Sequence, residues 1–296
     1  MNVDGSVELQ EPAGTLRFSH RAMNTVFEII CTHPDADYAR QATLAAFDVL
    51  GKLEQELSRF IENSDISRIN ALSAGETTRV NRWTMECLEL AQRGHAETAG
   101  AFDISLGTGL DRIALERADM LVRAARTGAR LDLGGIGKGY AVDRVVEILA
   151  DWEIPRAVVH GGYSSVRVLD APAGRAGWPL SMTMPNANEP FRLIEAHQIA
   201  FSASGTRKHD HVLDPRGGRP VRTQRASWAI APPEALAGFA APASSSPGAV
   251  LEIFSTAFLI LESVQIAELC RRYPGLEAWI AESDSAGVAR VTHFPA

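Results

Sequence analysis

The chain has 296 residues, of which 46% are hydrophobic and 22% charged, a composition typical of a globular protein with one large or two modest domains. Its formal net charge of −7 argues against general nucleic-acid binding. The three cysteines are far apart in the chain and suggest neither a disulfide framework nor a zinc site. We expect them to be buried, reduced thiols.

The N-terminal sequence M-N-V-D-G-S-V-E-L-Q is polar and acidic, without a basic start, an apolar stretch or a lipid-attachment cysteine. We therefore expect a cytoplasmic protein, with residues 1–14 as a flexible lead-in and residues 15–296 as a single domain. The apolar stretch at 253–261 contains Ser255 and Thr256 and is too short to span a membrane.

The first half of the chain mixes the patterns of strands and helices. The expected elements are strands at 16–20 and 25–31, a helix over 38–60, a structured loop over 59–71, a helix over 82–98 and a short helix over 115–125. The helix over 38–60 carries an apolar stripe that includes Leu44, Leu57 and Phe60. Asp103 lies in a loop rich in glycine and hydroxyl groups, and taken alone it is interpreted as a turn or helix-cap aspartate.

A glycine-rich stretch at the centre of the chain, L-D-L-G-G-I-G-K-G-Y-A-V-D-R over 131–144, carries the strongest functional signal. A short apolar run at 129–133 predicts a strand, and four glycines lie within the next six residues. A helix then begins, with Val142, Val145, Val146 and Leu149 on one face and Asp143, Arg144 and Glu147 expected on the other. A glycine-rich turn at a helix N-terminus suits phosphate, because free N–H groups and the helix dipole favour negative charge.

Lys138 adds a positive charge within this turn. The alternative is a tight turn whose glycines are needed for positive φ angles. The stretch is neither a Walker sequence, since no Ser or Thr follows Lys138, nor the G-x-G-x-x-G dinucleotide fingerprint.

The second half of the chain is expected to contribute mostly antiparallel strands. They are predicted at 157–159, 164–169, 179–184, 191–195 and 198–202, with two closing strands over 276–294. One helix is predicted over 251–269, and the Ala-, Pro-, Ser- and Gly-rich segment 232–248 is expected to be a mobile loop. These patterns predict an α+β fold in which antiparallel sheets pack against helices.

Several spaced motifs together resemble the ApbE-type FAD:protein FMN transferases over nearly the full chain. The similar segments are Met23–Thr25, Leu57–Phe60, Ser64–Asn70, Gly100–Asp103, Asp132–Asp143, Gly161-Gly162, Ala203–Gly205, His211–Gly218 and Glu252–Ala257. The glycine-lysine stretch and H-V-L-D-P-R-G-G at 211–218, in this order and spacing, make the resemblance fairly specific. It implies an ApbE/T-fold-like architecture.

The resemblance also implies an activity. Such proteins bind FAD and a divalent metal, usually Mg²⁺, split the pyrophosphate, release AMP and attach FMN to a Thr or Ser of an acceptor flavoprotein. Some members instead hydrolyse FAD to FMN and AMP. We therefore expect FAD as the substrate, Mg²⁺ or another divalent cation as the cofactor, and an acceptor protein as the partner, with no nucleic acid and no membrane span.

The resemblance assigns roles to individual residues. Flavin or adenine contacts are expected from Met23, Phe60, Ala101, Phe102 and Asp103, and pyrophosphate contacts from Gly134, Gly135, Lys138 and Tyr140. The carbonyl of Gly137, with Glu252 and Thr256, is expected to hold the metal; the two side chains are four residues apart on a predicted helix and so share a face. His211 is expected near the transferred phosphate, and His211 and Lys138 are the expected catalytic residues. Without the resemblance, the alternative interpretation of Thr256 is a helix hydroxyl that donates a hydrogen bond to a backbone carbonyl. That of His211 is a loop histidine hydrogen-bonded to Asp214.

Four positions depart from the family's motifs. Asn24 stands in place of a glycine, Tyr163 in place of an aspartate, and Gly217 in place of a threonine. Glu252 replaces the metal-binding aspartate and is one methylene longer, which matters because Mg²⁺ tolerates little distortion. These departures leave open an FAD pyrophosphatase, or a flavin-binding protein without turnover, beside the transferase.

Overall fold

In this computed structural model, the structure describes residues 7–9, 14–184, 189–205, 213–220, 225–239, 246–283 and 289–295. A central eight-stranded sheet has the order β16-β15-β14-β11-β8-β7-β3-β2, and every neighbouring pair is antiparallel. Its strands are β2 (Leu16–Ala22), β3 (Thr25–Cys31), β7 (Ala157–Gly161), β8 (Ser165–Val168), β11 (Ile199–Gly205), β14 (Arg225–Ala231), β15 (Glu277–Ser283) and β16 (Ala289–Phe294).

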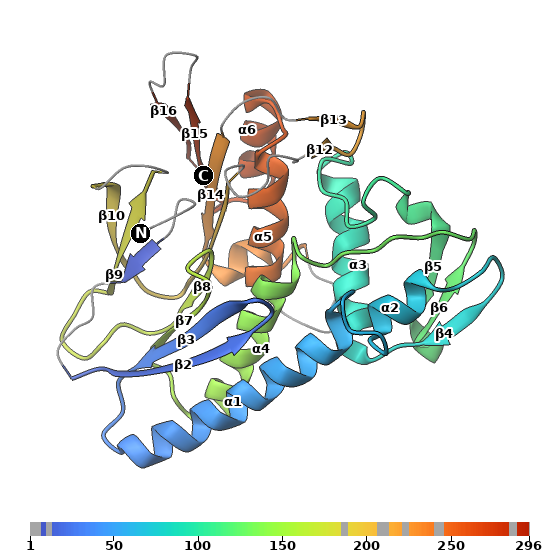
Figure 1. Cartoon of the computed structure of the whole chain (residues 1–296). Coiled ribbons are helices and arrows are strands. Elements are labelled where there is room, and N and C mark those ends of the chain that lie inside the picture. Colours follow the sequence, from blue (N-terminus) through green and yellow to red (C-terminus); the bar gives the residue numbers. More distant parts are fainter. Residues whose placement is uncertain are drawn as a thin grey trace.

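Helices cover one face of this sheet (Figure 1). They are α1 (Ala36–Leu57) on β2, α4 (Gly137–Asp151) on β7 and β8, and α5 (Pro247–Phe258) on β11 and β14. The main hydrophobic core lies between these helices and the sheet, with fully buried side chains that include Phe27, Leu50, Val142 and Phe254. Burial of this apolar surface is the principal force that fixes α4 and α5 against the strands.

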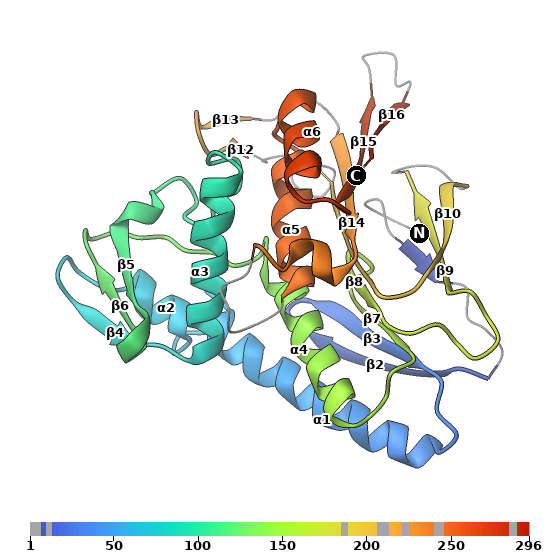
Figure 2. The same cartoon turned by 180° about the vertical axis from the view of Figure 1, so that it is seen from behind.

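The other face of the central sheet is covered by a three-stranded sheet, β1-β9-β10 (Figure 2). Its strands are β1 (Val7–Leu9), β9 (Trp178–Thr183) and β10 (Pro190–Ala196). A second hydrophobic cluster joins the two sheets, and in it Trp178 and Trp228 are fully buried. Because β1 pairs antiparallel with β9, residues 7–9 of the expected lead-in belong to this sheet.

A smaller lobe lies beside α5. It contains α2 (Asp65–Asn70), α3 (Arg82–Glu97), and a sheet of β4 (Thr77–Arg79), β6 (Leu121–Ala124) and β5 (Ile113–Glu116). Three 3-10 turns (Leu110–Arg112, Arg117–Asp119, Pro233–Leu236), the two-stranded hairpin β12 (Leu213–Asp214) and β13 (Arg219–Pro220), and helix α6 (Ser263–Arg272) complete the described elements.

The α+β class and the antiparallel sheets packed with helices are confirmed, and so are the strands at 25–31 and 157–159. Four predicted elements differ from the structure, and the first three are the following. The segment predicted as a helix over 115–125 forms parts of β5 and β6, because Met120 adopts a left-handed φ of 55° between them. The loop predicted over 59–71 contains α2, for which Ser64 is the N-cap. In place of the single helix predicted over 251–269, the chain forms two helices, α5 and α6, which end at Phe258 and begin at Ser263 respectively.

The apparent strand at 129–133 is an extended segment outside any sheet. The side chain of Asn70 takes the place of a strand partner, donating to the Leu131 carbonyl at 3.0 Å and accepting from the Leu131 N–H at 2.7 Å. This contact gives Asn70, the last residue of the S-x-x-S-x-x-N motif, a physical role: it aligns the chain that enters the glycine-rich stretch.

Two predictions about side-chain orientation are also wrong. Leu44 is 59% exposed, because it lies off the buried stripe of α1, and Phe60 is 80% exposed, because it follows the end of that helix. Asp143 and Arg144, predicted to lie on the helix face opposite Val142 and Val145, are buried as well. Asp143 pairs with Arg167 and accepts hydrogen bonds from the N–H groups of Gly248 and Ala249, so it caps the N-terminus of α5.

All three cysteines are buried and free of disulfides, as expected. Among the described residues no helix combines the length and apolarity needed to cross a membrane. The predicted mobile loop at 232–248 lies partly outside the described residues; its first part, 233–236, is a 3-10 turn.

Tyr163, one of the departures from the family motifs, belongs to a polar cluster on β3 and β7. Its hydroxyl donates to Glu28 Oε2 at 3.1 Å, and its ring stacks on that of His160 at 4.3 Å. The same oxygen accepts from Arg17 at 2.8 Å and lies 2.9 Å from His160 Nε2. The contacts with His160 foremost, and then those with Arg17, outweigh the effect of burial and lower the pKa of Glu28 to about 2.

A lowered pKa in the folded state stabilises the fold above the pKa of the unfolded chain, and this stability is lost as the pH falls through the folded value. We expect the Glu28 carboxylate to contribute about 2–3 kcal/mol at neutral pH, lost between about pH 4.5 and pH 2. Urea denaturation at several pH values should show the stability gap between wild type and Glu28→Gln closing over this range. A gap that stays constant down to the lowest pH would contradict this assignment.

Candidate functional site

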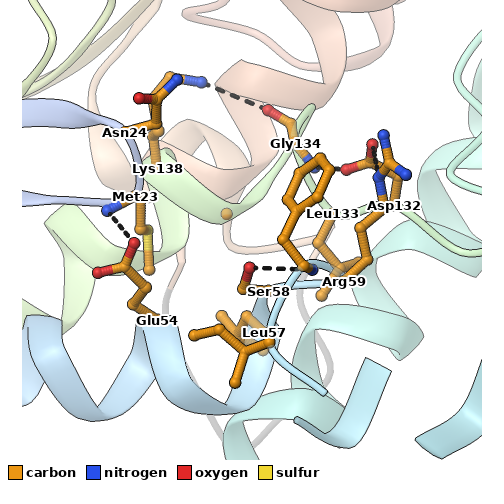
Figure 3. Close-up of a pocket in the computed structure, with 13 residues that line it drawn as sticks. Met23, Asn24, Glu54, Leu57, Ser58, Arg59, Asp132, Leu133, Gly134 and Lys138 are labelled. Atoms are coloured by element: carbon orange, nitrogen blue, oxygen red, sulfur yellow. Dashed lines mark hydrogen bonds and ion pairs between the residues drawn. The ribbon is translucent and has the colours of Figure 1, made fainter. Parts of the chain in front are cut away.

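A cavity of about 390 Å³ opens where the β2–β3 turn, the end of α1 and the glycine-rich stretch meet (Figure 3). These three segments are far apart in sequence and are brought together by the packing of α1 and α4 on the sheet. The lining residues are Met23, Asn24, Glu54, Leu57, Ser58, Arg59, Phe60, Ile61, Asp132, Leu133, Gly134, Gly137 and Lys138.

The first wall is the two-residue turn between β2 and β3. Met23 and Asn24 both have positive φ, 50° and 56°, which is the pattern of a type I′ hairpin turn. Asparagine tolerates this conformation better than most residues, so Asn24 can replace the family's glycine without losing the turn. The Met23 N–H donates to Glu54 Oε1 at 2.9 Å, which ties the turn to α1.

The second wall follows the end of α1. The Arg59 guanidinium carbon lies 4.2 Å from the centroid of the Phe60 ring, a cation–π geometry. Arg59 Nε donates to Asp132 Oδ2 at 2.6 Å and so bridges this wall to the glycine-rich stretch. Phe60 is left as a largely exposed aromatic side chain at the rim of the cavity.

The third wall is the glycine-rich stretch itself, and its glycines are not required for positive φ, since none of the four has one. Gly139 is needed for close packing, because a Cβ there would lie 2.3 Å from the Gly248 carbonyl oxygen. At Gly135 a Cβ would lie 3.2 Å from the Phe102 ring. At Gly137, which lines the cavity, no atom lies within 4 Å of the Cβ position, so this wall stays open to a ligand.

Backbone donors in this stretch are only partly available. The N–H of Gly134 donates to Asp132 Oδ1, that of Gly137 to the Leu133 carbonyl, and that of Gly139 to Glu252 Oε2. In the part of the chain that the structure describes, no acceptor meets the N–H groups of Gly135 and Lys138. The N-cap residue of α4, Ile136, makes no side-chain capping hydrogen bond, so these two donors remain available to an anion at the positive end of the helix dipole.

The Lys138 ammonium forms an ion pair with Glu252 and lies 3.4 Å from the Gly134 carbonyl oxygen. Glu252 projects from α5, is 3% exposed, and accepts from the Gly139 N–H at 2.5 Å through its other oxygen. Both carboxylate oxygens of Glu252 therefore face the first turn of α4.

Thr256 lies one turn further along α5, beside the same stretch. Its Oγ1 is 3.8 Å from the Cβ position of Gly135 and 3.5 Å from Ser204 Oγ. Glu252 and Thr256 thus share a face of α5, as their spacing predicts. Among the described residues there is no cluster of three or more His, Cys, Asp or Glu side chains that could hold a metal, so a cation here would need hydroxyl or carbonyl ligands as well.

Other expected residues lie outside the cavity lining. Ala101 and Phe102 are buried, with Phe102 packed beneath Gly135. Asp103 accepts from the N–H and hydroxyl of Ser105, the turn arrangement expected for it when taken alone. Tyr140 points into the core, where its hydroxyl donates to Glu86 Oε2 at 2.5 Å, so this geometry does not provide the phosphate contact expected of it.

His211 lies outside the described residues, as does much of the segment around it. Residues 213–218 of the same motif are described. Arg216 forms a bidentate ion pair with Asp214, at 2.9 and 2.8 Å, and this pair holds the turn of the β12–β13 hairpin.

Of the cavity residues, Met23, Phe60, Gly134, Gly137 and Lys138 were expected from the sequence. Glu54, Arg59 and Asp132 were not. Asp132 and Arg59 lie inside recognised motifs and could have been inferred from these. Glu54 is one charged residue among several on α1, and no sequence signal distinguishes it.

The sequence matches the family model described as "ApbE family" over residues 23–280. The chain belongs to the ApbE family. This match covers most of the chain and confirms the resemblance on which the residue roles were based.

Curated relatives carry the name FAD:protein FMN transferase. The protein from Treponema pallidum is 26% identical, over 78% of this chain and 74% of its own, and that from Vibrio cholerae is 22% identical, over 75% and 78%. In solved structures, flavin transferase ApbE from Vibrio cholerae matches with a TM-score of 0.79 at 18% identity, covering 95% of this chain and 97% of its own. The apo form of Pseudomonas stutzeri flavinyl transferase ApbE matches with a TM-score of 0.79 at 20% identity, covering 94% of each chain.

The solved structures confirm the ApbE-like fold. The family model and the curated relatives confirm that the chain is a flavin transferase.

Proposed function

We propose that this ApbE-family chain transfers FMN from FAD to a Thr or Ser hydroxyl of an acceptor protein, with release of AMP, in a reaction that needs a divalent cation. The observation that carries the proposal is the composition of one cavity wall. An open glycine face, two N–H groups that meet no acceptor among the described residues and the Lys138 ammonium lie together at the start of α4, and the exposed Phe60 ring lines the same cavity.

Each part of the cavity suits one part of FAD. The Phe60 ring and the Met23 side chain offer aromatic and apolar surface to a flat ring system. The N–H groups of Gly135 and Lys138, with the Lys138 ammonium, suit a pyrophosphate. Ala101, Phe102 and Asp103 remain proposed contacts of the flavin or adenine ends, and Tyr140 is a proposed support of the stretch from behind.

Electrostatics support the need for a cation. Among the described residues, the charged groups at the cavity are Lys138 and Arg59 on the positive side and Glu54, Asp132 and Glu252 on the negative side, a formal sum of −1. A pyrophosphate brings one further negative charge on each phosphate. Without additional positive charge, the anion would enter a site that is already negative, and like charges a few ångströms apart repel strongly even at an effective dielectric of about 20.

The residues present fit such a cation. Glu252 offers a carboxylate, Thr256 a hydroxyl, and Gly137 a backbone carbonyl, which are the hard oxygen donors that Mg²⁺ prefers. When bound, the cation would neutralise charge on the pyrophosphate and polarise the phosphorus for attack. The chain's own groups then orient the anion against the start of α4 and stabilise charge that develops on the phosphoryl oxygens.

His211 is proposed to accept the proton of the attacking hydroxyl or to serve as a charge partner of the phosphate. The acceptor oxygen forms a bond to the phosphorus of the FMN half while the bond from that phosphorus to the bridging oxygen breaks. AMP carries away the bridging oxygen.

The proposal is tested by incubating purified protein with FAD, Mg²⁺ and a candidate acceptor protein that bears a Thr or Ser target, and following AMP, with a chelator-treated sample as the control. AMP release that the chelator abolishes is expected. If no AMP forms at any Mg²⁺ or Mn²⁺ concentration while FAD still binds, the protein is a flavin binder without turnover, and the proposal is wrong.

The alternative of a flavin-binding protein is favoured by one observation. Both oxygens of Glu252 already have partners, Lys138 and the Gly139 N–H, so the carboxylate is less available than a free ligand would be. An FAD pyrophosphatase, which would use water in place of the acceptor hydroxyl, would release AMP together with free FMN and label no protein.

Arg59 offers a specific test of where the pyrophosphate binds. Its Nε is held by Asp132, but among the described residues its two terminal nitrogens have no hydrogen-bond partner, and the side chain lines the cavity. We expect Arg59→Ala to weaken FAD binding by roughly 10-fold, the effect of one charge-assisted hydrogen bond, and to leave riboflavin binding within about 2-fold. Fluorescence titration of both ligands measures this difference. Equal losses for FAD and riboflavin would show that Arg59 acts only by supporting Phe60.

A further inference from the structure

In the Lys138–Glu252 ion pair, two groups that are each expected to bind a ligand bind each other instead. Lys138 is the expected phosphate-binding cation, and Glu252 is the carboxylate of the expected metal site. In this structure the Lys138 ammonium pairs with Oε1 of Glu252. The Lys138 side chain is 26% exposed and reaches the cavity, whereas that of Glu252 is 4% exposed, so the pair lies at the boundary between the cavity and the α4–α5 contact.

The length of glutamate makes this contact possible. Its carboxylate extends from α5 to the first turn of α4, where the Gly139 N–H holds one oxygen at 2.5 Å. The other oxygen meets Lys138, which is also within 3.4 Å of the Gly134 carbonyl. An aspartate, one methylene shorter, would hold its carboxylate further back on α5.

We infer that Lys138 is an internal counter-cation of Glu252, and that a divalent cation binds by displacing its ammonium into the cavity, where it meets the pyrophosphate. This inference rests on the proposed function and deepens it. The lysine keeps its proton, and no covalent bond changes: one cation replaces another on a single carboxylate oxygen.

Two physical arguments support the exchange. A divalent cation and an ammonium on the same carboxylate would lie a few ångströms apart and repel, so they compete for Glu252. The displaced ammonium has an alternative partner, because Lys138 lines the cavity in which the pyrophosphate is proposed to bind. Cation binding and the delivery of Lys138 to the substrate are then coupled, and the coupling is reciprocal.

The decisive variant is Lys138→Met, examined for Mn²⁺ binding by electron paramagnetic resonance without FAD. Loss of the competing ammonium should tighten Mn²⁺ binding by roughly 5- to 150-fold, the usual range for coupled binding events. Lys138→Arg, which keeps the competing charge, should stay close to wild type. Lys52→Met, the same change at an exposed position of α1, is the matched control.

The direction of the effect distinguishes this inference from a purely structural role. If Lys138 only holds Glu252 in place, Lys138→Met should bind Mn²⁺ more weakly than wild type or equally well, and either result overturns the exchange. If neither protein binds Mn²⁺, the metal-dependent function fails as well. If wild type binds Mn²⁺ but Lys138→Met does not bind it more tightly, the exchange is rejected while the metal-dependent function stands.

A second measurement uses the unmodified protein. The chain has only three lysines, Lys52, Lys138 and Lys208, so acetylation at each can be followed by mass spectrometry. Addition of Mg²⁺ should raise the acetylation rate of Lys138 by roughly 5-fold or more relative to Lys52, because the ammonium leaves its carboxylate. An unchanged or lower rate at a Mg²⁺ concentration that saturates the site would contradict the inference.

Discussion

Replacing Lys138 with methionine is expected to lower the rate of FAD cleavage at saturating Mg²⁺ by roughly 100- to 1,000-fold, the usual effect of losing one preorganised charge at a transition state. The side chain lines the cavity at the start of α4, near the N–H groups of Gly135 and Lys138, which meet no acceptor in the described part of the chain. Methionine is similar in length and reaches the same region, but carries no charge. Most of the loss should therefore come from electrostatics rather than from an altered shape.

The rate should be measured as AMP release in single-turnover reactions with a saturating acceptor protein, so that product release does not mask the chemical step. Lys138→Arg keeps the charge but changes the donor geometry, and should recover part of the rate. Lys52→Met should behave as wild type. A Lys138→Met protein with a rate within about 3-fold of wild type would remove Lys138 from the catalytic machinery, since such a change is below the effect of one lost hydrogen bond to a charged group.

Gly139→Ala is expected to lower the free energy of unfolding by about 2 kcal/mol or more, even though alanine is the better helix former. The added Cβ would lie 2.3 Å from the Gly248 carbonyl oxygen and 2.6 Å from its carbonyl carbon. Both are backbone atoms at the start of α5, so relief of the clash requires α4 and α5 to separate. The same separation would pull Glu252 away from the Gly139 N–H and disturb the site.

Gly51→Ala is the matched control. Gly51 lies inside α1, where no atom is within 4 Å of a Cβ position, so alanine there should raise stability by up to about 1 kcal/mol. Denaturant unfolding of both variants measures the contrast. A Gly139→Ala protein that is as stable as Gly51→Ala would show that the close approach of α4 and α5 is not required.

Local sequence patterns predicted the elements in which apolar residues recur at a single regular spacing, helical or alternating. The hairpin β2–β3 and the central part of the α1 stripe, Phe47 to Leu57, are of this kind. The patterns failed where a long-range contact decides the conformation. The segment 129–133 looks like a strand, but its partner is the side chain of Asn70, 61 residues away. The break between α5 and α6 depends on the capping box of Glu262 and Gln265, which is weaker as a sequence signal than one with Ser or Thr.

For the site, too, local sequence features were predicted correctly and long-range contacts were not. The glycine-rich stretch was identifiable because its composition is unusual, yet the reason for its glycines was not, since Gly139 is fixed by α5 rather than by its own φ angle. Tyr140 lies within the motif and still points to Glu86, because the buried network of α3 and α4 determines its orientation. The bridge from Arg59 to Asp132 joins residues 73 apart and required the structure.

The most direct test of the central claim is to measure AMP and protein-bound flavin in the same reaction. The protein, FAD and Mg²⁺ are combined with a candidate acceptor, and with the same acceptor after its target Thr or Ser is replaced by Ala. The account predicts one AMP released for each FMN covalently attached, with no attached flavin on the Ala variant or in the presence of a chelator. AMP matched by free FMN, with no acceptor labelled, would contradict transfer and identify a hydrolase.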